Sequence, residues 1–352
     1  MTTESNQPTA PATAATSPAT PAASADAASA ARAARKAAAL PPAALPPAAT
    51  LARSRAELAA ALSTDTAPRA VVMTMGALHQ GHFDLVAEAA RRVGDQGTVV
   101  VTIFVNPLQF AAGEDLEAYP RTLEADVAGL TATLTAPDGA LRVGRLVVFA
   151  PTPEVMYPDG DPAVRIDPGP IATVLEGKTR PTHFGGVCQV VLSLMHLTSP
   201  QWALFGRKDA QQLAIVRAMV RDLSVPLEIV PVEIRRERDG LAMSSRNAYL
   251  SATERQQALA LSQALAVGLE AAAKGADAVA VRAAALKHLQ AAPGVEVDYV
   301  ALVDPDSFVD LAGAGLGLPA DAAAPVPAVG LLALAAKVGK TRLIDNAIVK
   351  LS

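Results

Sequence analysis

Short, continuously apolar runs recur through the middle of this 352-residue chain, and segments with helical periodicity separate them. The runs are "AVVMT" (70–74), "GTVVVTIFV" (97–105), "RLVVFAP" (145–151), "WALFG" (202–206) and "PLEIVPVEI" (226–234). Strands that are apolar on both faces are typical of a parallel sheet covered by helices on both sides. The helical segments between them lie at 54–63, 82–93, 122–132, 185–199 and 209–223. The pattern therefore predicts a doubly wound, parallel-sheet α/β domain over residues 51–234.

The pattern changes after residue 235. Ser251 and Glu254 have the spacing of a capping box, which predicts the start of one long helix. The elements expected after it are a second helix over about 277–291 and strands within 295–304 and 329–349. We therefore expect a smaller α+β C-terminal domain over residues 235–352, beside a Rossmann-like N-terminal domain.

The first fifty residues differ from the rest in composition. They are nearly all Ala, Pro, Ser and Thr, and after Met1 no large apolar residue occurs before Leu40. Such a segment cannot bury enough surface to offset its ordering entropy, so residues 1–50 are predicted to be a disordered tail. An arginine-containing, Ser- and Ala-rich start is also typical of organelle transit peptides, but Glu4, Asp26 and the many prolines argue against one.

Charge, hydropathy and cysteine usage exclude several classes of protein. A formal net charge of −4 provides no overall basic field for nucleic acid or an anionic membrane surface. No uninterrupted apolar run reaches the roughly 18 residues that a membrane span needs. The single cysteine, Cys188, lies in "GVCQVVLSLM" and is interpreted as a small core residue, which fits a reducing cytoplasm.

Two short motifs mimic a phosphate-binding P-loop. "VGKT" (338–341) and "EGKT" (176–179) contain the required Gly-Lys pair. The glycine that should precede this pair by five residues is replaced by Leu334 in one case and Ala172 in the other. Neither segment is expected to bind a nucleotide.

The segment "TMGALHQGH" (74–82) places two histidines between a predicted strand and a predicted helix. Zinc is not favoured, because no third ligand lies at metal spacing. A glycine-bearing turn at a helix N-terminus instead directs N–H groups and a positive helix end at an anion. Gly76 and Gly81 lack the Cβ atoms that would hinder close approach. Phosphate binding by His79 and His82 is thus favoured, with a purely capping or solvated role as the alternative.

Other polar side chains follow successive predicted strands. The carboxyl edge of a doubly wound sheet is where such folds bind ligands. The side chains expected there are Asn106 and Gln109 in "IFVNPLQF", Lys208, Asp209 and Gln212 in "FGRKDAQQL", and Arg246 in the serine-rich "GLAMSSRN". Each one alone is a weak signal, but together they indicate a site for a phosphorylated ligand.

These segments, together with "RPTHFGGV" (180–187), resemble in order and spacing the pantothenate synthetase (pantoate–β-alanine ligase) family of the H-x-G-H nucleotidylyltransferase superfamily. The resemblance implies an AMP-forming carbon–nitrogen ligase of coenzyme A biosynthesis. Such an enzyme condenses (R)-pantoate with β-alanine through a pantoyl-adenylate intermediate, giving pantothenate, AMP and pyrophosphate. It further implies ATP as a substrate with Mg²⁺, no nucleic-acid or membrane partner, and a cytoplasmic homodimer.

The resemblance also implies roles for individual residues. The catalytic residues would be His79, His82, Lys208 and Arg246, with His82 in the place of a proton donor. The remaining ATP-binding residues would be Met75, Gly76, Gly206, Asp209, Arg235, Met243, Ser244 and Ser245. Pantoate and β-alanine would be bound by Gln109, Gln212, Asn106 and Tyr119, and Mg²⁺ would contact Asp126.

The chain departs from the family pattern at several positions near this site. Met73 replaces a proline, and Gln80 replaces a glutamate between the histidines. Arg207, Ala210 and Arg235 stand where the family has an acidic, an aromatic and a small apolar residue, respectively. None of these changes removes a side chain expected to contact phosphate, so they bear on ATP affinity and loop movement.

Two alternatives to an active ligase would require a different set of residues. Another nucleotidylyltransferase on the same fold would keep both histidines but would have no need of "NPLQF" or the paired glutamines at 211–212. A non-catalytic homologue would have lost at least one of His79, His82, Lys208 and Arg246, and all four are present. The ligase is the favoured interpretation.

Overall fold

The computed structural model describes residues 49–351 except 64–65, 112–113, 115 and 322–326, and the described residues belong to one compact unit. The predicted disordered tail therefore lies outside the described residues, apart from residues 49 and 50. These two begin a strand rather than end a tail. The proposed division at residue 234 stays a prediction.

The larger sheet has six parallel strands in the order β1-β4-β3-β2-β5-β6. They are β1 (Ala49–Ala52), β2 (Arg69–Thr74), β3 (Thr98–Ile103), β4 (Arg145–Phe149), β5 (Trp202–Gly206) and β6 (Glu228–Val232). The five predicted strands are confirmed. The edge strand β1 was not predicted, because its sequence "ATLA" carries almost no β signal.

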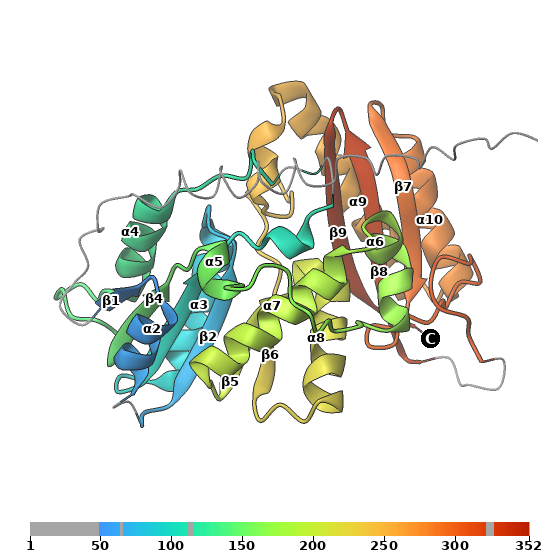
Figure 1. Ribbon diagram of the computed structural model, residues 1–352. Coiled ribbons are helices and arrows are strands. Elements are labelled where there is room, and N and C mark those ends of the chain that lie inside the picture. The colour runs from blue at the N-terminus through green and yellow to red at the C-terminus, as the bar shows by residue number, and fades with distance from the viewer. Residues whose placement is uncertain (1–48, 64–65, 112–113, 115, 322–326, 352) are drawn as a thin grey trace, which may run out of the picture. The chain divides into compact units, whose positions relative to one another are not determined.

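Helices cover both faces of this sheet (Figure 1). One apolar core joins the sheet to α3 (Gln80–Val93) and α4 (Leu123–Leu134). A second core joins its other face to α2 (Arg55–Leu62), α7 (His183–Thr198) and α8 (Ala210–Asp222). The doubly wound architecture is thereby confirmed, and each helix lies where its sequence period placed it.

Several short elements connect this framework, and none of them was predicted. Their sequences are too short to show a helical period. They are α5 (Pro153–Met156), α6 (Leu175–Thr179) and the 3-10 turns η1 (Pro107–Gln109), η2 (Pro170–Thr173), η3 (Arg207–Asp209) and η4 (Ser245–Tyr249).

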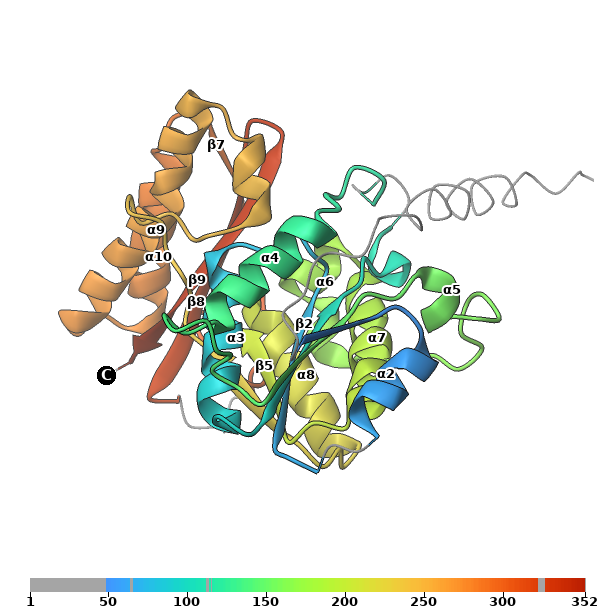
Figure 2. The ribbon, with the colours of Figure 1, turned by 90° about the vertical axis from the view of Figure 1, so that its left-hand side faces the viewer.

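A second, antiparallel sheet contains β7 (Val295–Val303), β8 (Val329–Val338) and β9 (Thr341–Lys350), as expected for an α+β C-terminal region. One of its faces shares a core with α9 (Ala252–Ala273) and α10 (Ala278–Gln290), which lie side by side on it in Figure 2. The predicted capping box of Ser251 and Glu254 starts α9. The opposite face packs against Leu175 of α6 and Ala214 of α8, so the small sheet shares a buried core with two helices of the N-terminal region.

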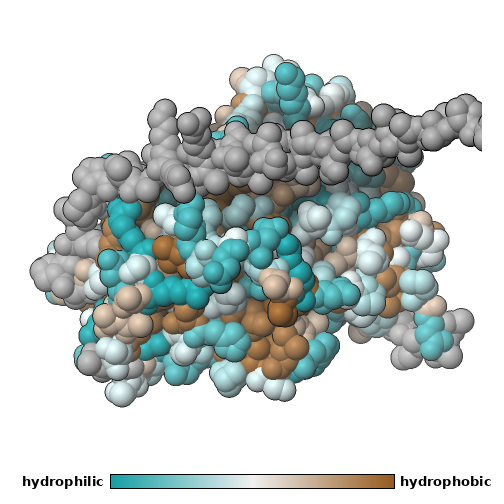
Figure 3. Space-filling model, in the orientation of Figure 1, coloured by the Kyte–Doolittle hydropathy of each residue, from teal (hydrophilic) through white to brown (hydrophobic). Residues whose placement is uncertain are grey.

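Polar side chains interrupt the apolar patches over the face drawn in Figure 3. Among the described helices, none is long and apolar enough to span a membrane. Cys188 of α7 is 1% exposed and belongs to the apolar core, as predicted. Burial raises the pKa of its thiol to about 12.

Candidate active site

The order of the large sheet reverses between β2 and β5, because the chain proceeds outward from β2 on one side and from β5 on the other. Ligands bind at such a switch point, beyond the carboxyl ends of the strands. The histidine turn follows β2 and η3 follows β5, so both reach this position. A cavity of about 270 Å³ lies there. It is lined by these predicted residues: Met75, His79, His82, Gln109, Tyr119, Gly206, Lys208, Asp209, Gln212, Arg235, Met243, Ser244, Ser245 and Arg246.

The turn before α3 is held by a buried carboxylate. Gly76 has φ +87°, and an added Cβ would lie 3.1 Å from Ile103 Cγ2, so glycine suits this position. Asp126 accepts hydrogen bonds from the backbone N–H of Ala77 (3.1 Å) and of Leu78 (2.7 Å). The Thr122 hydroxyl donates to the same carboxylate at 3.1 Å. Asp126 therefore organises the turn, and its predicted contact with Mg²⁺ stays a prediction.

Both histidine side chains accept hydrogen bonds from backbone N–H groups at the start of α3. His79 is the N-cap of α3, and its Nδ1 accepts from Gly81 N–H at 3.2 Å. His82 Nδ1 accepts from His79 N–H at 3.2 Å, and the ring centroids are 4.1 Å apart. Since Nδ1 is an acceptor in both rings, the proton of each neutral imidazole lies on Nε2. The capping alternative is thus correct for Nδ1, while Nε2–H is left as a donor for a ligand.

Burial keeps both imidazoles neutral at pH 7. Desolvation, with the neighbouring His79 as the second cause, lowers the pKa of His82 to about 3. Desolvation also lowers the pKa of His79, with Lys208 as the second cause. In the ligand-free site the pair therefore offers neutral N–H donors, and Lys208 supplies the positive charge.

Asn106 positions Gln109. The Asn106 side chain is fully buried, and its Nδ2 donates to Gln109 Oε1 and to the Gly186 carbonyl, both at 3.0 Å. Its Oδ1 accepts from the Tyr157 hydroxyl at 3.0 Å. With the Gln109 oxygen engaged in this way, the Gln109 amide N–H₂ is the group available to a substrate. Asn106 does not line the cavity itself.

Arg180 and His183 also line the cavity, although the sequence assigns them no role. Arg180 pairs with Glu114 at 2.6 Å and donates to the Gln109 carbonyl at 3.2 Å. His183 Nδ1 lies 3.2 Å from the same carbonyl, which can only accept, so the proton is on Nδ1. Burial lowers the pKa of His183 to about 4, with Arg180 as the second cause. Both residues belong to "RPTHFGGV", which was the available sequence signal.

The cationic groups approach the cavity from two other segments. Lys208 lies in the single turn η3, and within the described residues its ammonium has no ion-pair partner. Ser244 starts η4, and its hydroxyl accepts from Arg246 N–H at 3.3 Å. Tyr119 is 7% exposed, and its ring packs edge-on against that of Phe110, with the two ring centroids 6.1 Å apart.

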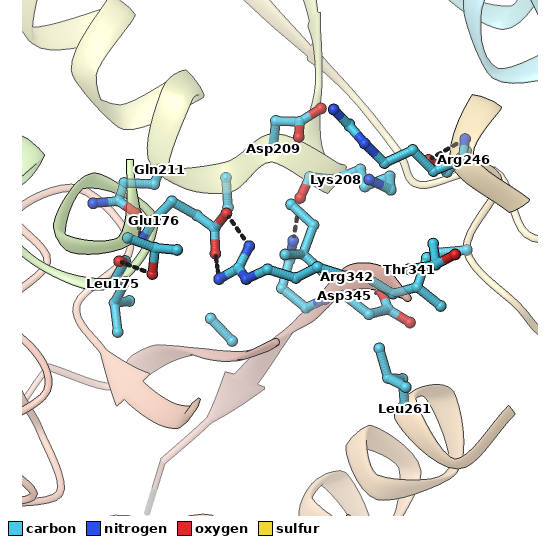
Figure 4. A pocket seen from close by; sticks show the side chains of 18 of the residues that line it. Leu175, Glu176, Lys208, Asp209, Gln211, Arg246, Leu261, Thr341, Arg342 and Asp345 are labelled. Carbon is cyan, nitrogen blue, oxygen red and sulfur yellow. Dashed lines mark hydrogen bonds and ion pairs between the residues drawn. The ribbon is translucent and has the colours of Figure 1, made fainter. Parts of the chain in front are cut away.

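A second cavity, of about 930 Å³, adjoins the first and shares Lys208, Asp209, Gln212 and Arg246 with it. Its opposite wall comes from the small sheet. Figure 4 shows Arg342 of β9 pointing at Glu176 of α6, to which its guanidinium donates two hydrogen bonds of 2.7 Å. The phosphate-binding candidates Lys208 and Arg246 thus lie between the carboxyl edge of the large sheet and the small sheet.

Comparison with known proteins identifies the family of this chain. A sequence model of the family described as Pantoate-beta-alanine ligase matches residues 48–348. The chain belongs to this ligase family. It is 48% identical over 305 residues to the pantothenate synthetase of Nocardioides sp., with 85% of each chain covered. It is 49% identical over 303 residues to that of Salinispora arenicola, with 86% of this chain and 98% of the relative covered.

Solved structures of family members confirm the fold. Pantothenate synthetase from Thermus thermophilus matches with a TM-score of 0.72 at 42% identity, covering 85% of this chain and 98% of that one. Pantoate–β-alanine ligase from Francisella tularensis, solved with beta-gamma ATP and β-alanine, matches with a TM-score of 0.63 at 28% identity. That match covers 86% of this chain and 98% of the other.

The departures from the family pattern have local partners. Met73 lies within β2, paired with Thr102, so the strand rather than a proline ring fixes its backbone. Arg235 forms two hydrogen bonds of 2.6 and 2.7 Å with Asp84, which Gln80 also contacts at 3.2 Å. Arg207 pairs with Glu233 at 2.9 Å, which offsets its added charge. Nothing in the structure explains Ala210.

Proposed function

We propose that this protein catalyses the ATP-dependent condensation of pantoate with β-alanine, giving pantothenate, AMP and pyrophosphate. The observation that carries the proposal is the convergence, at the switch point, of His79, His82, Lys208 and Arg246 with the amides of Gln109 and Gln212 in one cavity. Membership of the ligase family and the nucleotide-bound relative support the same activity.

In the first step, a pantoate carboxylate oxygen attacks the α-phosphorus of ATP, and the bond to the bridging oxygen of pyrophosphate breaks. Negative charge grows on the phosphoryl oxygens and on the departing pyrophosphate. The Nε2–H groups of His79 and His82, the Lys208 ammonium and the Arg246 guanidinium are assigned to stabilise that charge. Gln109 and Gln212 are assigned to orient pantoate, with Asn106 fixing Gln109 and Tyr119 bounding the site.

In the second step, the amine of β-alanine attacks the acyl carbon of pantoyl adenylate, and AMP leaves as a proton is lost from nitrogen. The reaction needs the activated acyl group to be shielded from water. We assign the nucleotide contacts of this step to Met75, Gly76, Gly206, Asp209, Arg235, Met243, Ser244 and Ser245. Residues 235–352 are proposed to act as a lid in the sense of a fixed cover, which shields the site at the edge of the domain of residues 51–234.

Mg²⁺ is proposed to enter as the counter-ion of ATP. Within the described residues, no group of three or more His, Cys, Asp or Glu side chains is arranged to hold a metal ion. Mg²⁺ commonly binds through substrate phosphates and water with few protein ligands, which is compatible with such a site. We further propose that the protein is cytoplasmic and forms a homodimer, and sedimentation equilibrium would test the oligomeric state.

The deciding experiment incubates the purified protein with Mg²⁺, ATP and pantoate, with or without β-alanine. We expect pyrophosphate with pantoate alone, and free AMP and pantothenate only when β-alanine is also present. Absence of both products under all conditions would instead support a non-catalytic homologue.

A further inference from the structure

Strand β9 carries two adjacent polar side chains that are almost fully buried. Asp345 is 3% exposed and Asn346 is 6% exposed, and their cross-strand partners in β8 are the apolar Leu334 and Ala333. A buried carboxylate or amide is costly unless it is hydrogen-bonded. Both side chains find partners outside their own sheet, in segments that reach the proposed ATP site.

Asn346 holds the backbone of η3. Its Nδ2 donates to the carbonyl of Arg207 at 3.0 Å and to the carbonyl of Lys208 at 2.8 Å. These two carbonyls precede α8, whose first residue is Ala210. One amide group therefore fixes the single turn from which the Lys208 side chain extends.

Asp345 holds the second cationic segment. Its carboxylate accepts from both terminal nitrogens of Arg236, at 2.7 and 3.0 Å. Arg236 also donates to the Gly240 carbonyl at 3.1 Å, within a hairpin closed by the bond of 2.9 Å from Met243 N–H to the Arg235 carbonyl. That hairpin leads directly into Ser244 and Arg246.

We propose that Asp345 and Asn346 are positioning residues that hold the Lys208 turn and the 244–246 segment at a fixed separation. The inference rests on the proposed function. β9 is paired with β8 from Thr341 to Lys350, so it offers a rigid common support for two segments far apart in sequence. Charges fixed in advance stabilise a transition state without reorganising, and small misplacements are costly.

A double-mutant cycle on the full chain tests this proposal. Asn346→Ala, Lys208→Ala and the double variant are compared by kcat for pyrophosphate release and by ATP affinity from calorimetry. We expect Asn346→Ala alone to lower kcat by about 10- to 100-fold and to weaken ATP binding. In the Lys208→Ala background it should add almost nothing, because Asn346 acts through Lys208.

Asp310→Ala is the matched control for lost stability. Asp310 is a buried acceptor for Ala312 and Leu316 N–H in the C-terminal region, and it contacts neither cationic segment. Its removal should lower Tm but leave kcat at the parental value. Asn346→Leu retains the side-chain size without the donors and adds no buried charge, and it takes the place of Asn346→Ala should that variant not fold.

Two results would overturn the positioning role. One is a double variant whose loss equals the product of the single losses. The other is a loss in Asn346→Ala no greater than that in Asp310→Ala at equal Tm. If the parental protein releases no pyrophosphate, the proposed function fails, and the cycle in ATP affinity then decides the positioning role by itself.

Discussion

The two ring nitrogens of His82 have separate tasks, and substitutions can distinguish them. Asparagine places a polar atom near the position of Nδ1 and can still accept from His79 N–H, whereas glutamine reaches the position of Nε2. We expect His82→Asn to lower kcat by ~10², the usual cost of losing one transition-state donor, and His82→Gln to lose clearly less. Steady-state pyrophosphate release measures both variants. Equal losses in the two would show that Nε2–H is not the important group.

Asp126 provides a second test at this scale. Asp126→Asn turns one acceptor oxygen into a donor that faces backbone N–H groups, so we expect it to cost about 1–3 kcal/mol of unfolding free energy and to impair turnover. Because the carboxylate acts on the turn, additional Mg²⁺ should not restore activity. Urea unfolding and a Mg²⁺ titration of kcat check the two parts. Recovery at high Mg²⁺ would support the assignment of Asp126 as a metal contact.

At the scale of elements, adjacent arginines offer a matched comparison. Arg235 joins the segment after β6 to α3 through Asp84, but its side chain is 45% exposed. Arg236 pairs with Asp345, whose side chain is only 2% exposed. Arg235→Ala should therefore leave the free energy of unfolding almost unchanged, whereas Arg236→Ala should lower it by about 3 kcal/mol, because it leaves a buried carboxylate without its partner. Denaturant unfolding of both variants decides, and equal costs would contradict the argument.

The sequence predicts helices and strands well where the segment is long enough to show apolar periodicity. Strands β2 to β6 and the long helices of both regions lie at their expected positions, because apolar periodicity reflects burial directly. β1, α6 and the 3-10 turns were not predicted, since segments of three to five residues show no period and depend on tertiary contacts. The backbone of Met73 is likewise fixed by a tertiary contact, its pairing with Thr102 of β3.

At the scale of the whole molecule, the order of strands explains why the site could be anticipated in part. Residues at strand ends, such as His79 and Lys208, converge because β2 and β5 are neighbours at the switch point. The supporting contacts could not be read from the sequence. Asn346 reaches Lys208 from 138 positions away, and Asp126 reaches Leu78 from 48 positions away, and no local pattern encodes such pairs.

The buried histidines make the stability of the folded chain depend on pH. The pKa of His79 is lowered, that of His82 is lowered to about 3 and that of His183 to about 4, whereas an unfolded histidine titrates near 6.5. Below pH 6.5 the unfolded chain binds protons that the folded chain does not, so stability must fall as the pH falls. The slope is at most about 1.4 kcal/mol per pH unit for each histidine.

Urea unfolding between pH 7 and pH 5 measures this dependence, in a range above that in which most carboxylates titrate. We expect the parental protein to lose stability steadily over this range. His82→Asn should show a shallower slope, because one suppressed titration is gone. A slope that is unchanged in His82→Asn, or a protein more stable at pH 5 than at pH 7, would mean that these imidazoles are not held neutral by burial.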